Sequence, residues 1–300
     1  MADVIKGLVT ITGKEQIRHN AHLTTYPDGT GVLLVADRAI FMEQGWELAS
    51  DKVKHTLDAS DIPEDPENTV FWEKSVWDLE RTDAVRLQRK IENAKRAQRR
   101  ARRALRDLAK SNRFRWFVTL TLDRKKVDRY DIKEITRKLN AWLDNMVRRK
   151  GLKYVLVPER HKDGAVHFHG LFSDNIEVVD SGHKDEGGHT IYNMPQWTLG
   201  FTTAIELYGE LDKAVGYVLK YIGKQMAHEK LGDSGETMMV PRKIGGRWYY
   251  SGGDLLRPRV EALDVDYTLY AGLSDAYQFT LEHIGVTVLS IKIDGGLTYA

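Results

Sequence analysis

The sequence predicts an α+β fold in which a central antiparallel sheet has helices packed on one face, with extensions at both ends of the chain. Short runs of apolar and β-branched residues, bounded by Gly, Pro and polar residues, indicate strands. Longer segments carry apolar residues at spacings of three and four, which is typical of amphipathic helices. In the middle of the chain these segments follow one another as strand, helix, strand, strand, long loop, strand and helix, an order that suits a sheet with helices packed against it.

The composition excludes several kinds of chemistry. The 300 residues are 42% hydrophobic and 29% charged, which is typical of a globular protein with one large domain or two modest ones. The chain has no cysteine, which excludes disulfides, cysteine-ligated zinc, iron–sulfur clusters and a cysteine nucleophile. The first residues do not form a signal peptide, and no apolar run approaches the ~20 residues that span a bilayer. We therefore expect a cytoplasmic protein that has no membrane partner and binds any metal through His, Asp and Glu.

Residues 1–80 form an N-terminal extension to which the sequence assigns no role. A hairpin is expected there, with strands at residues 22–25 and 32–35 joined by a turn at residues 27–29. Residues 59–69 are acidic and contain two prolines, which is typical of a linker or exposed loop.

Residues 81–112 are expected to form one long basic helix, ending at Ser111 and Asn112. Between residues 81 and 115 there are 14 Lys and Arg against 3 Asp and Glu, whereas the rest of the chain has 31 against 40. Such a concentrated basic patch is the usual footprint of a polyanion partner, although a solvated helix whose charges serve solubility is the alternative. The residues expected to contact DNA are Arg99, Arg100, Arg102, Arg103, Arg113 and Arg115.

Residues 113–230 are expected to form the core, and residues 231–300 a strand-rich C-terminal extension. Expected strands lie at residues 113–122, 154–157, 166–171, 200–207, 246–251 and 286–289; expected helices lie at residues 131–149 and 211–230. We interpret residues 173–195, which are polar and rich in glycine, as a long loop. The order of the core elements matches ferredoxin-like or RRM-like sandwiches, whose sheet leaves one face open to nucleic acid.

The segment on which the functional interpretation depends contains His167 and His169, separated by Phe168. In a strand, side chains two residues apart point to the same side, so both imidazoles would face one way and could share a divalent ion. A hairpin through residues 162–165 would bring Glu159 back beside the two histidines as an oxygen ligand. The alternative is a half-buried strand whose histidines are hydrogen-bonded or solvated.

A second candidate element is the helix that contains Tyr217 and Tyr221. The two phenols are four residues apart and so share one helix face, while Lys220 and Lys224 share an adjacent face. A phenol has a pKa near 10 and is a poor nucleophile at neutral pH, but a nearby cation would stabilise its phenolate. The alternative is that the tyrosines pack on the sheet while the lysines point to water.

Three motifs stand in order: Phe-Val-Thr-Leu-Thr at residues 117–121, His-Phe-His at residues 167–169, and the tyrosines at residues 217 and 221 with their lysines. This arrangement resembles the HUH endonuclease superfamily, and more narrowly the rolling-circle replication initiators (Rep proteins) of small single-stranded DNA phages and related plasmids. The resemblance covers roughly residues 113–225. Residues 1–80 and 260–300 are outside it.

The resemblance implies a site-specific nickase and strand transferase that acts on single-stranded DNA at a replication origin and forms a covalent 5′-phosphotyrosine. It assigns Tyr217 and Tyr221 as nucleophiles, Lys220 and Lys224 as groups that orient or neutralise the phosphate, and His167 and His169 as ligands of Mg²⁺ or Mn²⁺. Glu159 is the expected third ligand and His161 its competitor. Trp116 is an aromatic residue expected to stack on the DNA, whereas the helical stripe of Trp142 favours a core position.

The resemblance also implies a bacterial host cell. Because the chain contains no Gly-x-x-x-x-Gly-Lys-Ser/Thr phosphate loop, we expect a host helicase to unwind the DNA and a host polymerase to extend it. Two alternatives remain: a relaxase or single-strand transposase of the same superfamily, and a non-catalytic nucleic-acid binding module on an RRM-like sheet.

Overall fold

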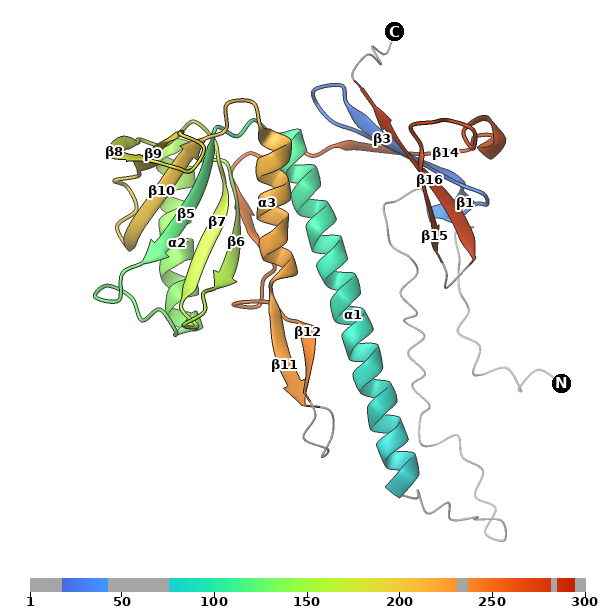
Figure 1. Ribbon diagram of the computed structural model, residues 1–300, viewed down its shortest axis with the longest axis horizontal. Coiled ribbons are helices and arrows are strands. Elements are labelled where there is room, and N and C mark those ends of the chain that lie inside the picture. Colours follow the sequence, from blue (N-terminus) through green and yellow to red (C-terminus); the bar gives the residue numbers. More distant parts are fainter. Residues whose placement is uncertain (1–17, 43–75, 231–236, 282–284, 295–300) are drawn as a thin grey trace, which may run out of the picture. The chain divides into compact units, whose positions relative to one another are not determined.

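The computed structural model describes residues 18–42, 76–230, 237–281 and 285–294, so the expected linker at residues 59–69 lies outside it. The chain divides into two compact units (Figure 1). The larger is Glu67–Arg257; the smaller combines Met1–Pro66 with Pro258–Ala300. No helix in the described ranges has the length and apolar character needed to span a membrane.

The larger unit is built on a seven-stranded sheet with the order β13-β6-β7-β5-β10-β9-β8, in which every neighbouring pair is antiparallel. The strands are β5 (Trp116–Leu122), β6 (Tyr154–Arg160), β7 (Val166–Phe172), β8 (Val179–Lys184), β9 (Thr190–Asn193), β10 (Gly200–Glu206) and β13 (Tyr250–Gly252). The helices are α1 (Val76–Ser111), α2 (Ile132–Lys150) and α3 (Leu211–Gly223), and α3 is followed by a hairpin of β11 (Met226–Lys230) and β12 (Thr237–Pro241). The predicted α+β class with a central antiparallel sheet is confirmed.

One face of the sheet is covered by α2. Leu120 of β5, Leu156 of β6 and Phe168 of β7 are buried in one cluster with Leu139 and Leu143 of α2. The helix begins at Asp131, whose side chain accepts hydrogen bonds from the first turn, and ends at Gly151, which has a positive φ. These caps fix α2 over β5, β6 and β7.

The opposite face is covered in part by α1 and α3, so the expectation that helices lie on one face only is wrong (Figure 1). Val155 and Val157 of β6 and Leu171 of β7 are buried with Val218 of α3 and Leu105 of α1. The physical reason is that β6 is apolar at successive positions rather than at alternate ones, so both of its faces need cover.

Close contact between β6 and β7 depends on a glycine directly after the second histidine. Gly170 lies opposite Leu156, and a Cβ atom built on Gly170 would lie 2.0 Å from the carbonyl oxygen of Val155. A side chain at this position would push the two strands apart. The glycine therefore keeps the histidine strand in register with the strand that carries Glu159.

Two boundaries differ from the sequence-based prediction. Residues 173–195 are not wholly loop, since they contain the β8–β9 hairpin, whose exposed strands can be polar because few of their side chains enter the core. The helix expected over residues 211–230 ends at Gly223, directly after the last apolar residue of its stripe, Ile222, and the chain continues into β11.

The smaller unit holds a five-stranded antiparallel sheet with the order β14-β2-β3-β16-β15. Its strands are β2 (Ala21–Thr25), β3 (Gly31–Ala36), β14 (Arg259–Leu263), β15 (Tyr277–Leu281) and β16 (Val286–Ile293), accompanied by the short pair β1 (Arg18–His19) and β4 (Phe41–Met42) and the turn η3 (Tyr267–Leu269). The pairing of β2 with β3 confirms the predicted N-terminal hairpin, and strands from the C-terminal part complete the same sheet.

Candidate active site

His167 and His169 project from β7 on the face of the sheet that α3 covers in part. Each lies opposite a threonine of β5: His167 opposite Thr121 and His169 opposite Thr119. Thr119 Oγ1 is 3.0 Å from His169 Nδ1, and Thr121 Oγ1 is 3.4 Å from His167 Nδ1. Each hydroxyl thus contacts the Nδ1 side of its ring and leaves Nε2 for another partner.

Glu159 lies beside both histidines, as the hairpin pattern predicts. It is the register partner of His167, and its Oε2 atom is 2.9 Å from Nε2 of His169. Neighbouring ligands held at ~2.1 Å from one divalent ion lie about 3 Å apart, so this pair has the spacing of two ligands of one ion.

The donor types also fit a divalent ion, because imidazole nitrogen and carboxylate oxygen both bind Mn²⁺, and His167 supplies another imidazole on the same face. Within the described ranges, however, no three His, Cys, Asp or Glu residues form a ready metal-binding group. His161, the competing ligand, stacks on His167 with ring centroids 5.2 Å apart and lies 3.5 Å from Asp163.

Lys224 provides positive charge beside this cluster. Its Nζ atom is 2.8 Å from Oε1 of Glu159, and it lies over the ring of Tyr221 at 4.9 Å from the centroid. Glu159 thus contacts His169 through one oxygen and Lys224 through the other. The ammonium group is positioned to neutralise an anion that approaches the same cluster.

Burial keeps both imidazoles in their neutral form. Removal from water lowers the pKa of His169 to about 4, although Glu159 opposes this shift. Burial also lowers the pKa of His167, and the neighbouring His161 adds to this effect. Neutral imidazole is the form that binds a metal, so both rings are ready to act as ligands at neutral pH.

The two tyrosines of α3 lie in different environments. Tyr221 is 5% exposed, and its ring is parallel to that of His169 with centroids 3.9 Å apart. Tyr217 is 47% exposed, meets Tyr221 edge to face at 5.2 Å, and lies beneath Nζ of Lys220 at 5.6 Å. Burial and a hydrogen bond with Tyr217 raise the pKa of Tyr221. A phenol and a cation are therefore accessible at Tyr217 and Lys220, directly beside the histidine cluster.

The basic residues expected to contact DNA are exposed, but they do not form one surface. Arg99, Arg100, Arg102 and Arg103 lie on the exposed side of α1, and Arg113 follows that helix. Arg115 is already paired, with Asp174 at 2.7 Å and Glu206 at 2.9 Å.

The expected stacking role of Trp116 is wrong. Its ring is buried on the α2 face, because β5 alternates and Trp116 falls on the apolar side. The core position favoured for Trp142 is confirmed, since its ring is buried and its Nε1 donates to Gln196 O.

One residue that positions the site escaped the sequence analysis. Gln225 is 2% exposed, and its Nε2 atom donates to the carbonyl oxygens of Pro158 and Trp248. It thereby fixes the end of α3 next to Glu159. A polar residue directly after the apolar stripe of a helix was the available signal, but its partners are distant in sequence.

Residues 115–226 match a family of replication-associated proteins, described as the ORF2 type. The matched segment contains β5, the histidines of β7, Glu159 and both tyrosines of α3, and the smaller unit lies outside it. No curated protein and no solved structure matches the chain. The part of the chain that carries the site is thus similar to replication-associated proteins.

Proposed function

We propose that this protein is a site-specific nickase and strand transferase that acts on single-stranded DNA and initiates rolling-circle DNA replication. The observation that carries the proposal is the stack of Tyr221 on His169, with the exposed Tyr217 beside it and Glu159 on the far side of the same imidazole. Two phenols next to a His/Glu cluster suit tyrosine-based cleavage of a phosphodiester, whereas pure binding needs neither group. The similarity of residues 115–226 to replication-associated proteins supports the biological setting.

In this proposal His167, His169 and Glu159 hold Mg²⁺ or Mn²⁺. The ion would supply Lewis-acid polarisation of the scissile phosphate and a template for its orientation. Thr119 and Thr121 hold the two imidazoles through Nδ1, so that Nε2 of each ring serves as the ligand atom.

The covalent step uses the phenol oxygen of one tyrosine. This oxygen attacks the phosphorus, the new Tyr–O–P bond forms as the P–O3′ bond breaks, and the leaving 3′ oxygen takes up a proton. The products are a 5′-phosphotyrosine and a free 3′-OH that can prime synthesis. Lys220 lies next to Tyr217 and Lys224 next to Tyr221, so each phenol has a cation that stabilises its phenolate and the charge on the phosphate.

The second tyrosine gives the proposal its strand-transfer step. While one tyrosine carries the DNA, the other can cut the regenerated origin, and the new 3′-OH then attacks the first phosphotyrosine to join the product into a circle. The edge-to-face contact of the two rings, with centroids 5.2 Å apart, places both phenols at the same cluster. A host helicase and polymerase would unwind and extend the DNA in the cytoplasm of a bacterial cell.

The test is a denaturing gel of the protein incubated with Mn²⁺ and a labelled single-stranded DNA pool from its own replicon. We expect a band of protein that covalently carries DNA, lost with EDTA and mapping to Tyr217 or Tyr221. A variant with both tyrosines changed to phenylalanine is the control. If the protein binds the DNA but never cuts it or forms an adduct, it is a binding module instead.

A further inference from the structure

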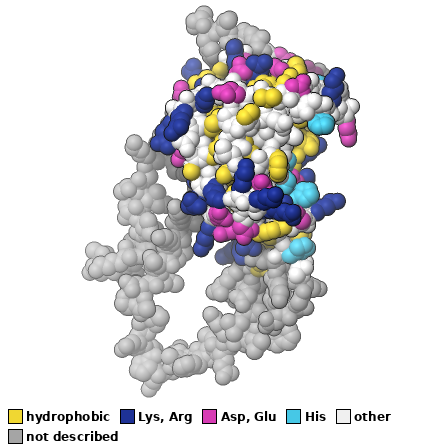
Figure 2. Space-filling view, turned by 90° about the vertical axis from the view of Figure 1, so that its left-hand side faces the viewer, with side chains coloured by type: hydrophobic (Ala, Val, Ile, Leu, Met, Phe, Trp, Pro, Cys, Tyr) yellow, Lys and Arg dark blue, Asp and Glu magenta, His cyan; other side chains and the backbone are white. Residues whose placement is uncertain are grey.

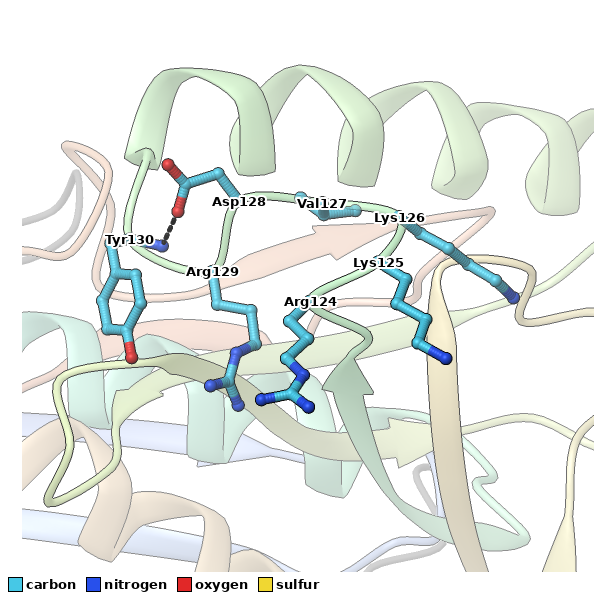
Figure 3. A pocket seen from close by; sticks show the side chains of 7 residues that line it. All are labelled: Arg124, Lys125, Lys126, Val127, Asp128, Arg129 and Tyr130. Atoms are coloured by element: carbon cyan, nitrogen blue, oxygen red, sulfur yellow. Dashed lines mark hydrogen bonds between the residues drawn. The ribbon is translucent and has the colours of Figure 1, made fainter.

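A pocket of about 560 Å³ lies at the end of β5 and is lined by residues 124–130, which we call the basic loop (Figure 3). The loop contains Arg124, Lys125, Lys126 and Arg129. In Figure 3 the guanidinium groups of Arg124 and Arg129 point into the same space, with Tyr130 on one side and Lys125 on the other. Four cations within six residues around one concave surface form a local site for an anion.

The basic loop is anchored directly beside the candidate active site. The carbonyl oxygen of Arg129 accepts a hydrogen bond from the N–H of Val166, the residue before His167. At the other end, the N–H of Asp123, the residue before the loop, donates to Leu199 O, and Nζ of Lys126 donates to Thr198 O. The loop therefore lies between the start of the histidine strand and the start of β10.

The cations of the loop are largely free to meet a ligand. The two nearby carboxylates serve the backbone, since Asp123 accepts from the N–H of Lys125 and Asp128 from that of Tyr130. Arg124 and Lys125 form no ion pair within the described part of the chain.

Arg129 is only loosely held. Its Nε is buried without a hydrogen-bond partner in the described structure, and its Nη2 is 3.7 Å from Asp163. The face drawn in Figure 2 carries acidic and basic side chains together, so the basic loop is a local feature and not part of a uniformly basic face.

An exposed aromatic ring stands next to this loop. Phe201 of β10 is the register partner of Thr121, whose side chain contacts His167, so the ring projects from the same face of the sheet as the histidines. It is 65% exposed. An exposed ring on a sheet beside free cations is the combination that binds single-stranded nucleic acid, because each base offers a π-face and each nucleotide a phosphate.

We infer that Phe201 and the basic loop form a subsite for a nucleotide that flanks the scissile phosphate, with the base stacked on Phe201 and the phosphate bound by Arg124, Lys125 and Arg129. The inference rests on the proposed function, and it adds the register of the strand. A nucleotide held here fixes which phosphodiester reaches Tyr217 and His169. The subsite thus contributes to the choice of the cleaved bond.

The experiment uses the full chain with Tyr217→Phe and Tyr221→Phe, which binds without cutting, and an oligonucleotide that spans the nick mapped with wild-type protein. Each phosphate of the oligonucleotide is replaced in turn by an uncharged methylphosphonate. We expect binding to weaken at one or two phosphates next to the nick, and this sensitivity to vanish in Arg124→Ala/Lys125→Ala. The salt slope of the variant should fall by about 1.4, which corresponds to two lost contacts with a single strand. Phe201→Ala should weaken binding about tenfold or more.

Arg149→Ala is the matched control, because this exposed arginine lies in the last turn of α2, outside the basic loop. Arg124, Lys125 and Phe201 are exposed, so their substitutions should leave the fold intact, which circular dichroism checks. If wild-type protein cuts DNA but the variants keep its phosphate profile and affinity, this inference alone is wrong. If wild-type protein neither cuts nor binds single-stranded DNA, the proposed function fails and the inference fails with it.

Discussion

The rings of Tyr221 and His169 lie parallel, with centroids 3.9 Å and planes 5° apart. The same imidazole is 2.9 Å from Glu159 through Nε2 and 3.0 Å from Thr119 through Nδ1. The candidate nucleophile helix and the candidate metal ligands are thus joined through one histidine. A change at any of these residues should be felt by the others.

The first prediction concerns the two tyrosines, whose environments differ. Tyr217→Phe should reduce formation of the first covalent adduct more than Tyr221→Phe, because Tyr217 is the exposed phenol whereas burial and a hydrogen bond raise the pKa of Tyr221. Adduct yield in the first turnover, measured with Mn²⁺ by rapid quench, checks this. Each single variant should keep some nicking and the double variant none, so normal nicking by the double variant would contradict the assignment of both nucleophiles.

Sequence periodicity was sufficient to predict the elements around the site. The alternation in β5 and the spacing of the two histidines predict which side chains share a face, and the short hairpin predicts that Glu159 returns beside them. These are local relationships, set by backbone geometry over a few residues.

What the sequence did not predict depends on long-range packing. The contact of Lys224 with Glu159 joins residues 65 apart, and the burial of Tyr221 requires α3 to lie on the histidine face. Strand periodicity does not specify which helix covers which face. The same limit explains why Trp116 was expected to be exposed and why the partners of Gln225 were missed.

A second prediction concerns the threonines that hold the histidines. Thr119→Val keeps the shape of the side chain but removes the hydroxyl that contacts Nδ1 of His169. Loss of such a partner costs about 10- to 100-fold in metal affinity or activity. Binding of Mn²⁺, measured by calorimetry, should weaken by that factor, and Thr119→Ser should restore it. Unchanged Mn²⁺ affinity in Thr119→Val would show that the hydroxyl does not orient a metal ligand.

A third prediction tests removal of the carboxylate. Glu159→Gln keeps the size of the side chain, but it removes the charge that faces Lys224 and one expected oxygen ligand. Mn²⁺-dependent nicking should fall by at least about 100-fold, and excess Mn²⁺ should recover part of it if the loss lies in metal binding. Single-stranded DNA binding in EDTA should be unchanged or stronger, because a negative charge has been removed. Nicking at the wild-type rate would exclude Glu159 as a ligand.

A fourth prediction concerns the exposed arginines of α1. Changing Arg99, Arg100, Arg102 and Arg103 to glutamine should weaken DNA binding and flatten its dependence on salt, because each lost phosphate contact reduces the slope by about 0.7 for a single strand or 0.9 for a duplex. Comparing the two slopes shows which form of DNA the helix contacts. Arg149→Gln, in the last turn of α2, serves as the control. If both variants keep the wild-type slope, α1 is a solvated helix whose charges serve solubility.

The last prediction concerns stability. Gly170→Ala would place a Cβ atom 2.0 Å from the carbonyl oxygen of Val155, and the strands of the site must separate to accommodate it. Such overpacking costs about 3 kcal/mol in the free energy of unfolding, measured by urea denaturation. Gly216→Ala is the matched control, because its Cβ would meet no atom within 4 Å, and alanine in a helix interior is favoured over glycine by about 1 kcal/mol. The two substitutions add the same methyl group and should shift the unfolding midpoint in opposite directions, because only Gly170 lies where two backbones meet.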